Sequence, residues 1–154
     1  MSNLPMDTMA TFKLHSTGTG VLQEIKTEGS DHIINVDAAP VFGGKDRHPS
    51  PMSYVFASLI SCSQVTAQHV AKEFNIELNS FEFDLKANLD TVILSTGAME
   101  GNPNFQNVDV NIIVETNASK DDFQNFSKET ERRCPLYQLF AKSGSSINYN
   151  WVIK

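Results

Sequence analysis

The 154-residue sequence predicts a single α+β domain over residues 1–154. Three observations lead to this fold class. Short segments near both ends alternate apolar and polar residues with a period of two, one long central segment keeps helical spacing, and strands do not alternate with helices in βαβ fashion. The 40% hydrophobic content is enough for one core, and a chain of this length needs no disulfide or metal to fold.

The N-terminal third predicts three short strands followed by a loop. Apolar residues recur with a period of two in three segments, residues 12–14, 21–25 and 32–36. The segment Thr17-Gly18-Thr19-Gly20 and the segment Glu28-Gly29-Ser30 mark the turns between these strands. Residues 38–50 contain two prolines and two glycines, so we expect a loop there.

The clearest predicted element is a long helix that begins at Pro51 and ends at Phe74. Ser50 is a suitable N-cap, proline is favoured at the first helical position, and no further Gly or Pro interrupts the segment. Apolar residues keep helical spacing, and many of the other positions hold Ala, Ser or Cys, which permit close backbone approach. We therefore expect this helix to be buried centrally.

The C-terminal half predicts two longer strands, two helices and a last strand. Strict alternation returns over residues 81–89 and 108–114, with a Gly- and Pro-containing loop between them. Ser119 followed by two aspartates predicts the start of a helix that runs to about Arg133. A short helix over residues 136–142 and a strand over residues 147–153 complete the chain.

Charge and cysteine content restrict the class of partner. Twelve basic against 18 acidic residues give a formal net charge of −6, which disfavours nucleic acid because phosphates are bound by clustered Lys and Arg. No apolar run approaches the ~18 residues of a membrane span, and the N-terminus lacks a secretory pattern, so we expect a cytoplasmic protein without a membrane partner. The chain has no close Cys/His grouping, and we expect no metal and no cofactor.

The two cysteines are the residues best suited to chemistry, and each has two interpretations. Cys62 lies in the middle of the long helix, where it is either a small buried hydrophobic residue or a reactive thiol that needs a cation from another element. Cys134 precedes Pro135 at the start of a helix. It is either a simple N-cap or a thiol whose ionised form is favoured by the free N–H groups there.

Two sequence motifs carry a family resemblance. The run Gly43-Gly44-Lys45-Asp46-Arg47-His48-Pro49-Ser50-Pro51-Met52 leads into the helix with Cys62, and Cys134-Pro135-Leu136-Tyr137 follows later. Together they resemble the OsmC/Ohr family of thiol peroxidases, and the order of elements agrees from about Phe12 to Lys154. The resemblance implies an intertwined homodimer. The first strands of one chain join the sheet of the other, and both thiols lie at the subunit interface.

The resemblance also implies an activity in oxidative stress defence. By motif position, Cys62 is the peroxidatic residue that attacks an organic hydroperoxide and becomes a sulfenic acid. Cys134 is the resolving residue that condenses with it to a disulfide, which a dithiol reductant reopens. The assignment comes from the resemblance alone.

The chain departs from the peroxidatic members of this family at two points. They carry a Glu where this chain has Met52, and an Arg on the N-terminal strands where residues 12–27 offer only lysines. We therefore consider three other arginines as candidates to stabilise the thiolate: Arg47, Arg132 and Arg133. The alternative hypothesis is a noncatalytic dimer that binds a small apolar ligand at the subunit interface, in a pocket lined by Met52, Val55, Phe56 and Tyr137.

Overall fold

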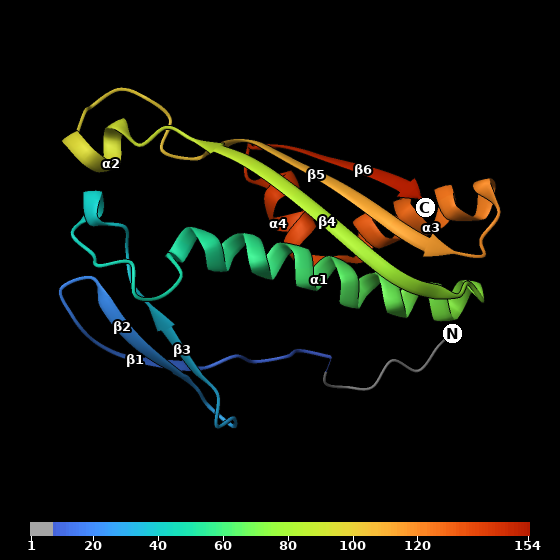
Figure 1. Cartoon of the computed structure of the whole chain (residues 1–154), viewed down its shortest axis with the longest axis horizontal. Coiled ribbons are helices and arrows are strands. Elements are labelled where there is room, and N and C mark those ends of the chain that lie inside the picture. Colours follow the sequence, from blue (N-terminus) through green and yellow to red (C-terminus); the bar gives the residue numbers. More distant parts are fainter. Residues whose placement is uncertain (1–7) are drawn as a thin grey trace. The chain divides into compact units, whose positions relative to one another are not determined.

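The computed structural model describes residues 8–154 and divides the chain into two compact units. One unit ends at Tyr54, and the other runs from Val55 to Lys154. Figure 1 shows the elements in chain order, three strands, one long helix, two strands flanking a short helix, two helices and a final strand. This is the α+β order that the sequence predicts.

The N-terminal unit contains three antiparallel strands in the order β1-β2-β3, as predicted. Their bounds are Leu14–Thr19, Leu22–Thr27 and Ile33–Val36. The first turn is shorter than predicted, because Gly18 lies in β1 opposite Gln23, and Val21 is in the turn rather than in a strand. Gly20 has a φ of 62°, the left-handed conformation that a tight hairpin turn requires.

The loop after β3 is built around Asp37, whose side chain is buried. Its carboxylate accepts hydrogen bonds from the backbone N–H groups of Ala38 at 2.8 Å, Lys45 at 3.2 Å and Arg47 at 3.0 Å. These bonds hold the pKa of Asp37 below its usual value, with the Arg47 N–H as the largest cause. Gly44 passes so close that a Cβ there would lie 1.8 Å from the Ala38 carbonyl oxygen, so only glycine fits. One 3-10 turn, η1 (Pro40–Phe42), lies within the loop.

The long helix α1 (Pro51–Phe74) has the predicted bounds. The Ser50 hydroxyl accepts a hydrogen bond from the Ser53 N–H at 3.2 Å, which confirms the predicted N-cap. Within the C-terminal unit one face of α1 is buried, whereas Val65 on another face is 59% exposed. We expected α1 to be buried centrally, but in the single chain only one of its faces is buried.

The C-terminal unit contains a second three-stranded sheet in the order β4-β5-β6. These strands are Leu78–Leu89, Phe105–Thr116 and Ser146–Ile153. Between β4 and β5 the chain forms a short helix, α2 (Val92–Thr96), that the sequence did not predict. From β5 the chain passes through α3 (Lys120–Arg133) and α4 (Pro135–Lys142) into β6.

The pairing of the last strand differs from the expectation that βαβ units are absent. β4 and β5 pair antiparallel, but β5 and β6 pair in parallel. Parallel neighbours need a crossover connection, which α3 and α4 supply. The short loop between these two helices is thereby carried past α1, and it contains Cys134.

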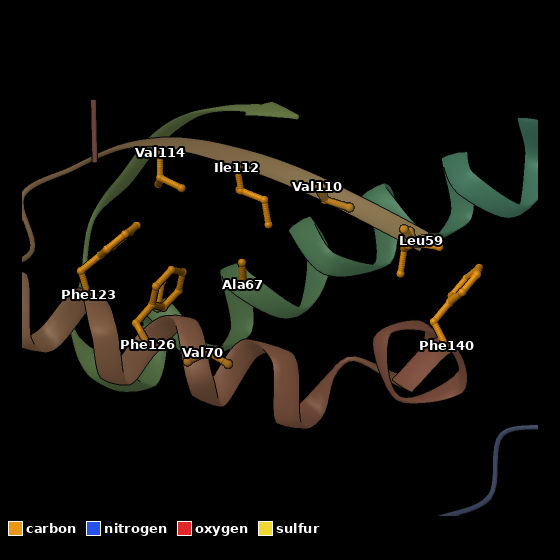
Figure 2. Close-up of a cluster of buried hydrophobic side chains, with 11 residues drawn as sticks. Leu59, Ala67, Val70, Val110, Ile112, Val114, Phe123, Phe126 and Phe140 are labelled. Atoms are coloured by element: carbon orange, nitrogen blue, oxygen red, sulfur yellow. The ribbon is translucent and has the colours of Figure 1, made fainter. Parts of the chain in front are cut away.

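The core of the C-terminal unit lies between one face of this sheet and the helices. Alternate residues of β5 are buried on this face: Val108, Val110, Ile112 and Val114. Figure 2 shows that β5 side chains face Ala67 of α1 and Phe126 of α3, with Phe140 of α4 at one end of the cluster. Phe126 is fully buried and packs edge-on against Trp151 of β6. This packing fixes α1, α3 and α4 on one side of the sheet.

Candidate functional site

The C-terminal unit brings the two cysteines together. Cys62 lies near the middle of α1 and is half-buried, and Cys134 lies between α3 and α4 and is fully buried. Both are free thiols, and the Cys134 side chain is within hydrogen-bonding reach of Cys62. Two residues separated by 134 − 62 = 72 positions thus form one thiol pair.

The N-terminus of α4 supplies a backbone donor to each sulfur. The Tyr137 N–H donates to Cys134 Sγ at 3.4 Å, so the cysteine is the N-cap of α4, and the Leu136 N–H donates to the Cys62 thiol. Pro135 occupies the first helical position, where its missing N–H costs nothing. The positive end of the α4 dipole therefore faces both sulfurs.

The pKa of Cys62 reflects opposing influences. Burial raises it, the Leu136 N–H lowers it, the neighbouring Cys134 raises it and the Thr66 hydroxyl lowers it, with a net increase over the ordinary value. Within residues 8–154, no arginine is among these causes. Cys62 is therefore protonated at neutral pH, and its ionised form depends on neutral donors.

A buried hydroxyl pair lies on the other side of Cys134. Ser63 Oγ is 3.7 Å from Cys134 Sγ and 2.7 Å from the Tyr149 hydroxyl oxygen, and Ser63 also donates to the Leu59 carbonyl oxygen at 2.8 Å. Burial raises the pKa of Tyr149, so it is a neutral phenol. The sequence analysis missed both hydroxyls, although Ser63 is adjacent to Cys62 and Tyr149 alternates onto the inner face of the last strand.

Two of the three candidate arginines bind carboxylates instead. Arg132 donates to Glu129 at 2.7 Å, and Arg133 binds both Glu129 and Glu73, the latter at 2.8 Å. The hydrogen bonds from Arg132 and Arg133 lower the pKa of Glu129 to about 2. Arg47 belongs to the N-terminal unit, where its backbone binds Asp37.

The four residues proposed to line an apolar pocket have separate surroundings. Met52 lies in the N-terminal unit and is 40% exposed, whereas Val55 packs against the core of the C-terminal unit. Phe56 packs edge-on against Phe105, with ring centroids 4.9 Å apart. Tyr137 packs edge-on against Tyr149, also at 4.9 Å. Burial and the nearby Glu131 together raise the pKa of Tyr137 to about 12, with burial as the largest cause.

A groove on the surface of the C-terminal unit lies away from the two thiols. The groove, of about 610 Å³, lies between α3 and β6 and is lined by Phe123, Ser127 and Trp151 among others, away from the thiols. In residues 8–154, no three His, Cys, Asp or Glu side chains are grouped so that they would hold a metal ion. No helix in this part of the chain has the length and apolar character needed to span a membrane.

Comparison with known proteins supports one family. A family model described as OsmC-like protein matches residues 43–150. A search of curated proteins gave no match.

Several solved structures have the same fold at low sequence identity. An OsmC-like protein from Mycoplasma pneumoniae is 16% identical with a TM-score of 0.78, covering 94% of this chain and 97% of that one. An organic hydroperoxide resistance protein from Elizabethkingia anophelis is 16% identical with a TM-score of 0.73, covering 97% and 100%. The organic hydroperoxide resistance protein OhrB of Bacillus subtilis is 18% identical with a TM-score of 0.60, covering 94% and 98%. Since the family match spans more than half of the chain and includes both cysteine motifs, the chain belongs to the OsmC-like protein family.

Proposed function

We propose that this protein reduces organic hydroperoxides in oxidative stress defence, with Cys62 as the peroxidatic and Cys134 as the resolving residue. The main support is the meeting of the two thiols at the N-terminus of α4, where Leu136 and Tyr137 each donate a backbone N–H to one sulfur. Similar structures include two organic hydroperoxide resistance proteins. The family includes such enzymes, and the activity of this chain is our inference.

The proposed reaction needs no cofactor. The Cys62 thiolate attacks one peroxide oxygen, the O–O bond breaks, and the alkoxide takes up a proton and leaves as an alcohol. The sulfenic acid left on Cys62 is attacked by the Cys134 sulfur, which forms a disulfide and releases water. A dithiol reductant then restores both thiols and is itself oxidised to a disulfide. The Leu136 N–H and the Thr66 hydroxyl stabilise the thiolate in the first step.

The proposed assembly is an intertwined homodimer of one OsmC-like domain per chain, residues 1–154, located in the cytoplasm. The N-terminal unit supports this proposal because its sheet has almost no core: every residue of β1 is exposed, and Val36 is the buried apolar residue of the described strands β1 to β3. A three-stranded sheet of this kind is not stable without a covering partner. A second copy of the chain supplies that cover in the swapped arrangement.

The decisive experiment counts thiols. Reduced protein is treated with one equivalent of cumene hydroperoxide, and free thiols are measured with and without denaturant. We expect two thiols to disappear per chain and mass mapping to join the Cys62 and Cys134 peptides, because their side chains already meet. The Cys62→Ser variant is the control and retains its remaining thiol. Unchanged thiols in the wild-type protein would refute the proposed activity.

A second function, a noncatalytic binding dimer, is favoured by one observation. The pKa of Cys62 is raised, and no arginine of the described residues contributes to it. In that case the predicted pocket residues Met52, Val55, Phe56 and Tyr137 bind a small apolar ligand while the thiols stay reduced. A fluorescent apolar probe that is displaced by long-chain alcohols, from a protein whose thiols resist the hydroperoxide, would establish this function instead.

A further inference from the structure

We propose that Ser63 and Tyr149 are positioning residues that stabilise the thiolate of Cys134 through a chain of hydrogen bonds from Tyr149 to Ser63 to Cys134. The inference deepens the proposed function, because it explains how the resolving cysteine leaves when the disulfide is reduced. It stands on three contacts of Ser63 Oγ: 3.7 Å to Cys134 Sγ, 2.7 Å to the Tyr149 hydroxyl and 2.8 Å to the Leu59 carbonyl oxygen.

The protons and lone pairs of these groups determine which of them donates and which accepts in each hydrogen bond. A serine hydroxyl has one proton and two lone pairs. While Cys134 is protonated, Ser63 donates to the Leu59 carbonyl, and its lone pairs accept from Tyr149 and from the Cys134 thiol. When Cys134 ionises, the sulfur becomes a stronger acceptor than the carbonyl, so the Ser63 proton turns to it. The Leu59 carbonyl oxygen keeps the backbone N–H of the helix as its partner, and the Tyr149 hydroxyl continues to donate to Ser63.

Burial makes these donors important. Cys134 and Ser63 are both 0% exposed, so water does not solvate a negative charge on the sulfur. The titratable groups around the chain are Cys62 on α1, Glu131 on α3, Tyr137 on α4 and Tyr149 on β6. None of these four carries a positive charge, and Glu131 is an acid. Apart from the Cys62 thiol, the Tyr137 N–H and the Ser63 hydroxyl are therefore the donors that face the Cys134 sulfur among the described residues.

A stabilised Cys134 thiolate makes the reduction of the Cys62–Cys134 disulfide faster. A reductant thiolate reaches the half-buried Cys62 sulfur more readily than the fully buried Cys134. The attack forms a mixed disulfide on Cys62, the Cys62–Cys134 bond breaks, and its electron pair leaves on Cys134 as a thiolate. The second thiol of the reductant then attacks the mixed disulfide, which frees Cys62 and oxidises the reductant. Thiol–disulfide exchange is faster when the leaving thiol has a lower pKa.

The test measures Cys134 directly and needs no peroxidase activity. In a Cys62→Ala background with ¹³Cβ-labelled cysteine, the single remaining thiol is titrated by NMR through its carbon shift. We expect Ser63→Ala to raise the titration midpoint of Cys134 by about one pH unit, the effect of one hydrogen bond to a charged group. Tyr149→Phe raises it by a smaller amount, because Tyr149 acts through Ser63.

Two comparisons separate this effect from a general loss of packing. Ser127→Ala is the matched control, since Ser127 is another buried helical serine that donates to the carbonyl four residues earlier and does not contact Cys134. We expect it to leave the midpoint unchanged. Tyr149→Phe has no effect of its own once Ser63 is alanine, if the two act in series.

The outcomes distinguish this inference from the proposed enzyme. A midpoint that moves with neither Ser63→Ala nor Tyr149→Phe overturns the inference, even if the wild-type protein consumes hydroperoxide. A shifted midpoint upholds it, even if thiol counting shows no peroxidase reaction. If Ser63→Ala does not fold, Tyr149→Phe decides, because it removes one hydroxyl and keeps the aromatic ring. In a chain that keeps both cysteines, we expect Tyr149→Phe to slow the reduction of the disulfide by dithiothreitol severalfold. The first oxidation step at Cys62 should keep its wild-type rate.

Discussion

The thiol of Cys62, near the middle of α1, accepts a hydrogen bond from the backbone N–H of Leu136, the second residue of α4. A sulfur in mid-helix finds no free N–H group in its own helix, because those groups are used in the i to i−4 ladder. The parallel crossover between β5 and β6 brings the start of another helix to it. A backbone donor thus lowers the pKa of Cys62 in a chain whose N-terminal strands lack the arginine that the family resemblance implies.

The first prediction concerns the pH dependence of Cys62. Because burial, the largest cause, raises its pKa, the thiol is mostly protonated at pH 7, and the thiolate fraction rises about tenfold per pH unit below the pKa. In a Cys134→Ser variant, the iodoacetamide alkylation rate of Cys62 should therefore be slow at pH 6.5 and rise steeply toward pH 9. Fast alkylation at pH 6.5 would mean that a cation outside the described contacts ionises the thiol.

The second prediction concerns the sulfenic acid intermediate on Cys62. Without Cys134, the sulfenic acid on Cys62 has no resolving partner, so cumene hydroperoxide should give a dimedone adduct on Cys62 in Cys134→Ser. The wild-type protein should give much less adduct, since its disulfide forms first. Mass spectrometry measures both. An equal yield in the two proteins would contradict a resolving role for Cys134.

The third prediction concerns which of the three arginines affects the Cys62 thiolate. Arg132 and Arg133 are held by Glu129 and Glu73, so replacing either by alanine should change the alkylation rate of Cys62 less than twofold at any pH. Arg47→Ala is the informative comparison, because Arg47 remains a candidate for the thiolate. A tenfold loss at pH 7 in Arg47→Ala alone would identify it as the missing cation. A similar loss in Arg133→Ala would contradict the observed ion pairs.

The fourth prediction concerns the glycine motif before α1. A Cβ on Gly44 would lie 1.8 Å from the Ala38 carbonyl oxygen, so Gly44→Ala should lower the free energy of unfolding by about 3 kcal/mol or more. Gly29→Ala is the matched control: its φ is +81° but nothing lies within 4 Å of the added atom, so we expect a loss of about 1 kcal/mol. Urea unfolding measures both. Equal losses would show that the loop around Asp37 relaxes to admit the methyl group.

The fifth prediction is the oligomeric state. Light scattering at micromolar concentration should give about twice the chain mass of 17.1 kDa, because the exposed strands of the N-terminal unit need cover. A monomer that stays folded would exclude the swapped assembly. It would leave the thiol pair intact, since Cys62 and Cys134 belong to the same unit of one chain.

Local patterns in the sequence predicted most elements of the fold correctly. The Ser50 cap, the uninterrupted run to Phe74 and the cap at Ser119 each act within a few residues, so both helices have the predicted start. The parallel pairing of β5 with β6 was not predicted, because strand direction depends on contacts distant in sequence. The short helix α2 was missed because the surrounding glycines indicated only a loop.

The candidate site was predicted less completely than the fold. The two cysteines follow from their motifs, but a survey of side chains does not reveal a backbone donor such as the Leu136 N–H. The role of Arg133 was open to a simpler interpretation, since Glu129 precedes it by four residues, the spacing of a helical ion pair. Ser63 and Tyr149 carried no motif. Their meeting depends on the packing of α1 against β6.

The long sequence separation within the thiol centre has a consequence for how the chain folds. Ser63 is 71 residues from Cys134 and 86 from Tyr149. Contacts of this kind close large loops, and the entropy lost in closing them must be offset before they form. The helix that carries Cys62 and Ser63 is built from local contacts, whereas its contacts with Cys134 and Tyr149 join parts of the chain that are distant in sequence. The hydrogen bonds around the thiol pair are therefore complete only when the topology of the chain is complete.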